Sequence, residues 1–329
     1  MTNFDKLFES FGSIKVGVIG DVMLDTYWWG RVERISPEAP VPVVSLHHKE
    51  YRIGGAANVA LNCKALGANV TVLSVTGDDD DAALLENLLN EQQINTSYLV
   101  KSKARITTNK TRVIGRNQQM MRLDSEITSD LSEEDEKRFL DQVRKYIERE
   151  NPSVLIFEDY NKGVLTENCI AAVIALCKEH NTITTVDPKR KNFFAYKGVD
   201  IFKPNLKEVK EGLNLTVDEA GVYILTEVHQ ALEAKLQHSV SFITLSEKGV
   251  FYNTDTAGII IPSHLRNIAD VSGAGDTVIA VASLLYAATK DVPLMAEVAN
   301  IAGGLVCEEV GTVAIDKEKL LQECKLLLS

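Results

Sequence analysis

The chain has 329 residues, enough for one large α/β domain or two small ones with ample core. Its 35 Lys and Arg residues against 46 Asp and Glu residues give a net charge of −11, which argues against general nucleic-acid binding. Five cysteines without a CxxC pair indicate neither a disulfide framework nor a zinc site, and the longest apolar run, 278–288, is too short to span a bilayer. We therefore expect a cytoplasmic protein with reduced thiols and no membrane partner.

The sequence begins with an amphipathic helical pattern over 4–11 and a buried strand over 14–20, which ends at Asp21. Ligands of open α/β sheets bind beyond the carboxyl ends of the strands, so Asp21 and Asp25 are candidate ligand residues. Because Asp is also common in turns and caps, a structural role is the alternative for both.

Two segments interrupt the alternation of strands and helices. The first, about 26–52, contains three prolines that exclude a helix, and we expect a strand over 41–46 within it. The second, about 104–124, alternates as strands do around a turn at 115–117. A hairpin here that paired with the first segment would form a β-lid, whose basic residues would face either an anion or solvent. These basic residues are Lys110, Arg112 and Arg122.

Between the two interruptions, Gly54 and Gly55 lead into a predicted helix that carries Asn58 in its first turn. Small residues at this point permit close approach of another backbone or of a ligand. A strand is predicted over 69–76, and the acidic run at 78–81 is interpreted as a solvated helix N-terminus rather than a metal site.

From about residue 130 onward, helices and strands alternate regularly. The predicted helices are 132–149, 166–180, 205–212, 217–236, 293–309 and 316–327, and the predicted strands are 153–157, 182–186, 200–202, 241–245 and a hairpin over 250–261. Polar residues recur just after successive strands, as expected at the ligand-binding edge of a doubly wound sheet. They are Asp159, Asp187, Lys189, Asn205 and Ser246. With no internal repeat or low-complexity linker, we expect one domain over 1–329 with a lid.

A turn of small residues, Asp270-Val-Ser-Gly-Ala-Gly-Asp276, runs straight into a strongly apolar helix. The amides of residues 273–276 would point outward at a helix N-terminus, which attracts anions. Asp276 would place a carboxylate beside these donors, and a base next to an anion cradle is what phosphoryl transfer to a hydroxyl requires. From these residues alone, an ordinary glycine-rich loop with a capping Asp is the alternative.

With these motifs in this order, the chain resembles the ribokinase-like (PfkB) carbohydrate kinases over nearly its whole length. The motifs that carry the resemblance are GGAAN at 54–58, KPNLKE at 203–208 and DVSGAGD at 270–276. The resemblance implies a doubly wound three-layer αβα sandwich with a small β-sheet lid. It also implies ATP and Mg²⁺ as cofactors, with a small-molecule sugar or sugar phosphate as the acceptor.

Within this family, the chain is similar to the D-glycero-β-D-manno-heptose-7-phosphate kinases in GDVMLD at 20–25, ISPEAPVPV at 35–43 and DYNKGV at 159–164. Those enzymes phosphorylate the anomeric hydroxyl of a heptose that already carries a 7-phosphate. The 1,7-bisphosphate that they form supplies ADP-heptose for the lipopolysaccharide core. Since no adenylyltransferase block follows the kinase motifs, the chain is expected to be a free-standing kinase with a separate adenylyltransferase downstream.

The resemblance also implies roles for individual residues. Asp276 would take the proton of the attacking hydroxyl while the amides of Gly273, Ala274 and Gly275 face the transferred phosphate. Asn205 and Glu208 would organise Mg²⁺ through water. The other nucleotide-side candidates are Lys189, Ser246, Lys248, Gly249 and Asn300. The acceptor-side candidates are Asp21, Asp25, Gly54, Gly55, Asn58, Arg112, Arg122, Asp159 and Lys162, with Lys110 and Lys189 behind them.

The chain departs from the family pattern in a few places. Glu158 stands where Ser is usual, Ser272 where Thr is frequent, and Asn161 where Gly is common. Glu308 and Glu309 add acidic charge near the expected adenine pocket.

Three other functions remain as alternatives. A related kinase could act on another acceptor, such as fructose, ribose or a ketose phosphate, and a neutral sugar would not need the basic residues of the lid. A nicotinamide-dependent oxidoreductase would need GxGxxG after the first strand, which residues 17–21 do not provide. A non-catalytic sugar-phosphate sensor is disfavoured by the intact Asp276. Exposed strand edges in the lid favour a homodimer formed through it.

Overall fold

The centre of the computed structural model, which describes residues 2–115, 118–215, 221–254 and 258–328, is an eight-stranded sheet. Its strands lie in the order β14-β13-β12-β11-β10-β9-β1-β4. Strands β4 through β12 of this order run parallel, whereas β13 and β14 are antiparallel to their neighbours. The bounds are β1 (Lys15–Gly20), β4 (Asn69–Leu73), β9 (Val154–Glu158), β10 (Ile183–Asp187), β11 (Ile201–Phe202), β12 (Val240–Thr244), β13 (Val250–Asn253) and β14 (Gly258–Ile261).

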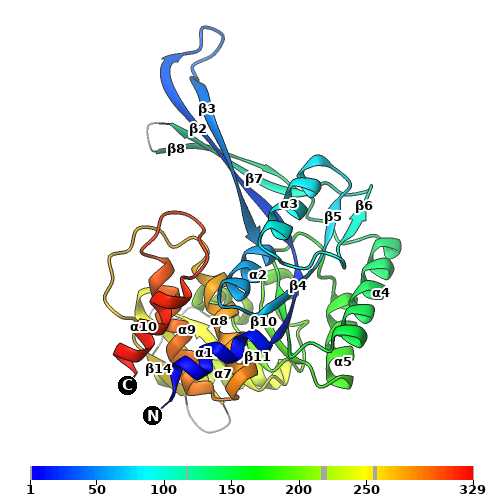
Figure 1. Ribbon diagram of the computed structural model, residues 1–329, viewed down its shortest axis with the longest axis vertical. Helices are drawn as coiled ribbons and strands as arrows, with labels where there is room; N and C mark the ends of the chain where they lie inside the picture. Colours follow the sequence, from blue (N-terminus) through cyan, green and yellow to red (C-terminus); the bar gives the residue numbers. More distant parts are fainter. Residues whose placement is uncertain (1, 116–117, 216–220, 255–257, 329) are drawn as a thin grey trace.

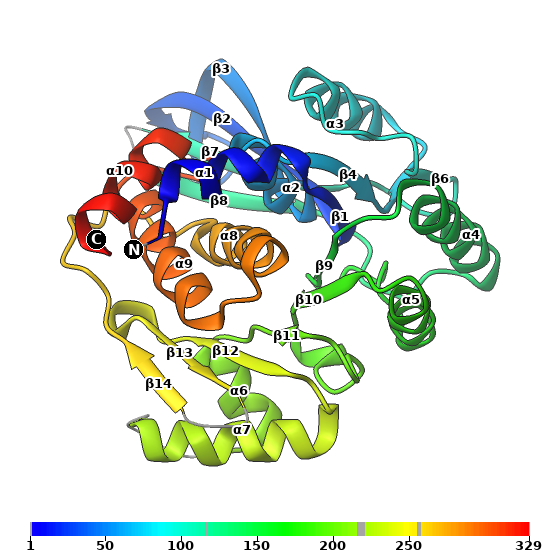
Figure 2. The same cartoon turned by 60° about the horizontal axis from the view of Figure 1, so that its bottom comes forward.

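Helices cover both faces of this sheet, so its parallel strands are buried on both sides (Figure 2). One face packs against α1 (Phe4–Ser10), α2 (Ala56–Ala65), α3 (Asp80–Glu91), α8 (Ala274–Thr289), α9 (Val292–Val306) and α10 (Lys317–Leu327). The other packs against α4 (Glu133–Glu150), α5 (Glu167–Glu179), α6 (Leu206–Leu213) and α7 (Val222–Leu236). The predicted doubly wound αβα sandwich is confirmed.

A second sheet of four strands projects from this body as a lid (Figure 1). Its order is β3-β2-β7-β8, with bounds β2 (Val22–Ile35), β3 (Pro42–Gly55), β7 (Thr108–Gly115) and β8 (Gln118–Ser125). Strand β2 pairs antiparallel with β3 and parallel with β7, so the two interrupting segments do join in one sheet. The strand expected over 41–46 is much longer, because β3 follows its partner β2 almost to the body.

Some local expectations need correction. The strand expected over 69–76 is two strands, since β4 ends at Leu73 and β5 (Val75–Gly77) leaves the central sheet to pair with β6 (Val100–Ser102). Strand β6 was not predicted, because its three residues are too few to show the alternation of apolar and polar side chains typical of a strand. Residues 116–117 of the expected lid turn, 217–220 of the expected helix and 255–257 of the expected hairpin lie outside the described residues.

The acidic run at 78–81 begins helix α3 but is more than a solvated turn. The Asp79 carboxylate caps the helix by accepting a hydrogen bond from the Ala82 amide at 2.8 Å. It also accepts bonds from the Thr107 amide and hydroxyl, at 2.8 and 2.7 Å, which anchors the start of the second lid segment. Among the described residues, no helix combines the length and apolar character needed to cross a membrane.

Candidate active site

The predicted anion loop lies at the N-terminus of α8, with Gly273 as its cap in the left-handed region at φ 80°. Asp270 shapes this turn by accepting bonds from the Ser272 amide at 3.0 Å and the Ser272 hydroxyl at 2.9 Å. The other oxygen of Asp270 accepts from the Gly311 amide at 2.9 Å. These bonds shape the loop at the N-terminus of a 16-residue helix, an end that favours an anion, while the Ala274 amide donates to the Val271 carbonyl at 3.3 Å in this structure.

Asp276 stands in the first turn of α8 with only 5% of its surface exposed. Its Oδ2 accepts a hydrogen bond from the Asn58 side-chain amide at 2.7 Å, and its Oδ1 accepts one from the Tyr160 hydroxyl at 2.8 Å. Burial raises the pKa of Asp276 to about 6, although both hydrogen bonds act in the opposite direction. The carboxyl is therefore ionised at neutral pH and has the basicity suited to a general base.

A buried ion-pair cluster lies beside this base at the ends of β10 and β11. Asp187 accepts from Lys203 at 2.8 Å and from Lys189 at 3.2 Å, and the Lys203 side chain is 2% exposed. Burial alone would raise the pKa of Asp187, but the two lysines lower it. A Cβ at Gly275 would lie 3.6 Å from an Asp187 oxygen and 3.9 Å from the Lys203 nitrogen, so the cluster borders the anion loop. Sequence reasoning selected Lys189 but missed Lys203, although its position directly after a buried strand was the available signal.

Asn205 and Glu208, the residues expected to organise a metal, form a capping box at the N-terminus of α6. The Asn205 carboxamide oxygen accepts from the Glu208 amide at 2.9 Å, and Glu208 Oε2 accepts from the Asn205 amide at 2.8 Å. Glu208 Oε1 accepts from Lys189 at 2.7 Å. Both side chains offer oxygen atoms of the kind that bind Mg²⁺, and each of these oxygens already accepts a hydrogen bond. This arrangement fits a divalent cation held through water rather than directly.

Glu158, which replaces the usual Ser, is fully buried at the end of β9. Neither side-chain oxygen has a hydrogen-bond partner among the described residues. Burial, followed by the nearby Asp187 and Asp276 carboxylates, raises the pKa of Glu158 well above its ordinary value. This shift of its pKa favours the protonated form of Glu158 beside the base.

Asp21 and Asp159 were expected to hold sugar hydroxyls, but both are 1% exposed and bonded within the chain. Asp21 accepts from three backbone amides, those of Tyr160, Lys162 and Val164, at 2.9 to 3.1 Å. Asp159 accepts from the Asn161 amide and from the side chains of Asn192 and Tyr196. In this structure their oxygens carry these bonds, which fix the loop after β9.

Asp25, which is also buried, lies where the lid meets the body and pairs with Arg112 at 2.5 Å. A Cβ at Gly54 would lie 2.4 Å from Asp25 Oδ2, so glycine there makes room for this carboxylate. Gly55, at φ 60°, similarly adjoins the backbone oxygen of Asp21. The close approach expected at these glycines is made by the chain itself.

The aromatic ring of Tyr27 lies between two guanidinium groups beside this pair. Arg112 stacks over it at 5.2 Å and Arg52 at 4.9 Å. Arg52 also donates to the backbone oxygens of Val310 and Thr312, near the anion loop. Sequence reasoning missed Arg52, whose position opposite Asp25 is set by the pairing of β2 with β3 in the structure.

Each of the other basic candidates on the acceptor side has a carboxylate partner. Lys162 pairs with Glu126 at 2.8 Å, and Lys110 lies within 3.6 Å of both Asp124 and Glu126. Arg122, half exposed on β8, binds Asp124 through two hydrogen bonds. These charges gather on the part of the lid nearest the loop after β9.

The nucleotide-side candidates lie along the opposite part of the sheet edge. Ser246 and Lys248 are exposed in the short helix η3 (Ser246–Lys248), and Gly249 turns the chain into β13. The Asn300 side chain in α9 donates to the Pro262 carbonyl at 2.9 Å, which fixes the segment that leads to the anion loop.

The acidic charge expected at the adenine side is partly neutralised within the chain. Glu308 pairs with Arg266 at 3.2 Å and with Lys319 at 2.8 Å. Arg266 also pairs with Glu323 at 2.6 Å. Glu308 therefore tethers α9 and α10 to the segment before the anion loop.

Residues 13–319 match the family model described as the pfkB family carbohydrate kinase. The chain belongs to the pfkB family of carbohydrate kinases. This kinase is a phosphotransferase acting on a sugar hydroxyl, and kinases of its family use ATP and a divalent metal.

Among relatives, this kinase is 37% identical over 322 residues to the bifunctional protein HldE of Geobacter sulfurreducens, covering 97% of the chain and 64% of that protein. It is also 37% identical over 306 residues to the bifunctional protein HldE of Helicobacter acinonychis, covering 93% of the chain and 65% of that protein. The chain thus spans less than two thirds of the length of these relatives.

Among solved structures, this kinase is similar in fold to phosphofructokinase-2 from Escherichia coli, with a TM-score of 0.77 and 17% identity over 95% of this chain and 99% of that one. It is also similar to ribokinase from Arabidopsis thaliana complexed with ribose and ATP, with a TM-score of 0.73 and 16% identity over 94% and 98%.

Proposed function

We propose that this kinase transfers the γ-phosphoryl group of ATP to the anomeric hydroxyl of D-glycero-β-D-manno-heptose 7-phosphate. The observation that carries the chemistry is Asp276, a buried and ionised carboxylate beside the amides of an anion-binding loop. The heptose acceptor is supported by the similarity to proteins named HldE and by the sequence stretches shared with heptose-phosphate kinases.

In the proposed reaction, Asp276 accepts the proton of the attacking hydroxyl. The amides of Gly273, Ala274 and Gly275 hold the transferred phosphoryl group at the positive end of α8, where charge develops on its oxygens. Lys189, near the loop and paired with Asp187 and Glu208, supplies a cation for the nucleotide phosphates. Positioning and charge neutralisation then provide most of the rate enhancement.

Asn205 and Glu208 would hold Mg²⁺ through water, and the ion would neutralise charge on the nucleotide phosphates. Ser246, Lys248 and Gly249 would border the nucleotide, and Asn300 would shape its pocket by holding the Pro262 carbonyl.

On the acceptor side, Asp25 would accept hydrogen bonds from sugar hydroxyls while Arg112 keeps its orientation. Asn58 holds the base in this structure and would border the reacting hydroxyl. The acceptor's own phosphate would bind the basic side chains of the lid, of which Lys162, Lys110 and Arg112 are the least exposed. Arg122, on β8, would also bind this phosphate.

A panel of acceptors tests this proposal by coupled ADP release with Mg·ATP. The panel contains D-glycero-D-manno-heptose 7-phosphate, sedoheptulose 7-phosphate, fructose 6-phosphate, ribose and fructose. We expect selective turnover of the heptose phosphate, with the new phosphate at C1 by phosphorus NMR. Preferred turnover of a neutral sugar or a ketose phosphate would contradict the heptose acceptor. The chain would then be a sugar kinase that acts on that other acceptor.

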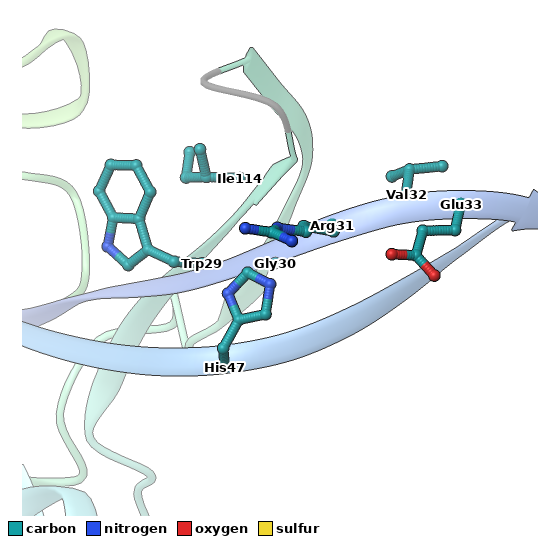
Figure 3. A pocket seen from close by; sticks show the side chains of 7 residues that line it. All are labelled: Trp29, Gly30, Arg31, Val32, Glu33, His47 and Ile114. Carbon is teal, nitrogen blue, oxygen red and sulfur yellow. The ribbon is translucent and has the colours of Figure 1, made fainter.

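We also propose that the lid forms a homodimer interface. Its outer part exposes Ile35, Leu46, Met121 and Leu123, and β3 and β8 are its free edges. A cavity of about 510 Å³ lies on this part of the lid, where Trp29, Arg31, His47 and Ile114 gather around it (Figure 3).

Light scattering coupled to size-exclusion chromatography tests the dimer. We expect twice the chain mass of 36.2 kDa for the unmodified protein. The paired substitution Met121→Glu and Leu123→Glu should give the monomer mass, because it places charge on the exposed apolar strand. A monomer in the unmodified protein would contradict the proposal.

A further inference from the structure

Tyr160 has no role in the proposed function, yet its hydroxyl is bonded to the proposed base. It lies in the loop that follows β9, and its phenol donates to Asp276 Oδ1 at 2.8 Å. Its backbone amide donates to Asp21 Oδ2 at 2.9 Å, and Lys189 lies over its ring at 5.5 Å. The phenol is therefore held in place from the backbone and from the ring face.

We propose that Tyr160 is a positioning residue for phosphoryl transfer, which keeps Asp276 an ionised carboxylate in a fixed orientation toward the acceptor hydroxyl. The inference rests on Asp276 being the base, and it goes beyond the proposed function because it assigns a role to a residue outside the expected site. Tyr160 acts through Asp276.

The carboxylate needs such support because it is almost completely buried, which favours the protonated and inactive form. The charged and titratable groups near it are Asp187 and Lys203 at the ends of β10 and β11, Lys189 beyond them, and Glu158 at the end of β9. Asp187 disfavours the ionised form and Lys203 favours it. The hydrogen bonds from Asn58 and Tyr160 then become the main factors that keep Asp276 ionised.

The geometry leaves room for the acceptor. A carboxylate offers about four lone-pair positions, and Asn58 and Tyr160 each occupy one, on different oxygens. Two donors on two oxygens fix the plane of the carboxylate and leave a lone pair for the proton of the hydroxyl. Tyr160 remains a donor throughout, because burial and the adjacent Asp276 raise its own pKa well above the ordinary value.

The variant Tyr160→Phe tests the inference in the ligand-free protein. Carbon-13 NMR of labelled aspartate carboxyls follows the titration, with the Asp276 signal assigned from its absence in Asp276→Asn. A hydrogen bond to a charged group is worth about 1.5 kcal/mol, or roughly one pKa unit. The pKa of Asp276 should therefore rise from about 6 to about 7.

The pH profile of kcat/KM should follow this titration with whichever acceptor the panel identifies. At about pH 6.5 the ionised fraction, and with it kcat/KM, should fall about threefold, whereas at about pH 8.5 it should stay near the unmodified value. A purely structural role would lower the activity equally at all pH values.

Tyr196→Phe is the matched control, because it removes a buried phenol–carboxylate bond of the same 2.8 Å length, to Asp159. It should lower stability and leave the Asp276 titration and the pH profile unchanged. If Tyr160→Phe does not fold, fluorotyrosine at position 160 strengthens the donor and should lower the Asp276 pKa instead.

An unchanged Asp276 titration in Tyr160→Phe would overturn the inference. Because the titration needs no acceptor, a shifted titration together with no turnover of the heptose phosphate would support the role of Tyr160 while the proposed acceptor failed.

Discussion

The substitution Asp276→Asn should abolish turnover and leave the protein folded. Asparagine cannot accept the proton of the hydroxyl, and loss of a general base costs on the order of 10²–10⁴ in rate. The side chain keeps its shape, and its oxygen still accepts a hydrogen bond from Asn58 or Tyr160. The measurement is kcat by coupled ADP release, with thermal unfolding of the same preparations.

Asp159→Asn is the matched control for this variant. Asp159 is equally buried in the neighbouring loop, and burial raises its pKa to about 6 as well. Because the partners of its oxygens among the described residues are Asn161, Asn192 and Tyr196, this change should cost stability and leave kcat of the folded protein near normal. A kcat near that of the unmodified protein in Asp276→Asn would mean that another group accepts the proton.

The substitution Lys203→Met should lower the free energy of unfolding by about 3–5 kcal/mol, the typical cost of removing one partner from a buried ion pair. Lys203 is the more deeply buried partner of Asp187, and its loss leaves the partly exposed Lys189 as the cation paired with that carboxylate among the described residues. Urea unfolding followed by fluorescence would measure the change.

The double variant Asp187→Asn with Lys203→Met provides the control. It removes both charges of the pair and should recover part of the lost stability, because no uncompensated carboxylate remains. A loss below about 1 kcal/mol in Lys203→Met would show that Lys189 alone suffices to compensate the charge of Asp187.

The central sheet could be predicted because its strands are buried on both faces. Runs 14–20 and 153–157 are mainly apolar, and 182–186 consists of β-branched residues; helices cover both faces of the sheet that these strands form. The break between β4 and β5 after Leu73 could not be predicted from the sequence, because the two strands differ in their pairing partners and not in a local sequence signal.

Prediction of the site was less complete, for a physical reason. Asp21, Asp25 and Asp159 all follow the same local pattern of an aspartate near the end of a strand. What separates Asp25 from the other two is which backbone amides fold over each carboxylate, and that depends on loop geometry. Tyr160 and Lys203 were missed likewise, because their importance lies in contacts with residues distant in sequence.

The pairing of Lys110, Lys162 and Arg112 with the chain's own carboxylates has a consequence for selectivity. In the proposed binding mode, a phosphate at Lys110 and Lys162 displaces Glu126 while the Asp25–Arg112 pair stays in place, so binding is an exchange of counter-ions. A neutral sugar cannot make that exchange and would leave the lid charges as they are. The carboxylates of the lid thus compete with the acceptor for the basic side chains. A dianionic acceptor can replace them there, and an uncharged acceptor cannot.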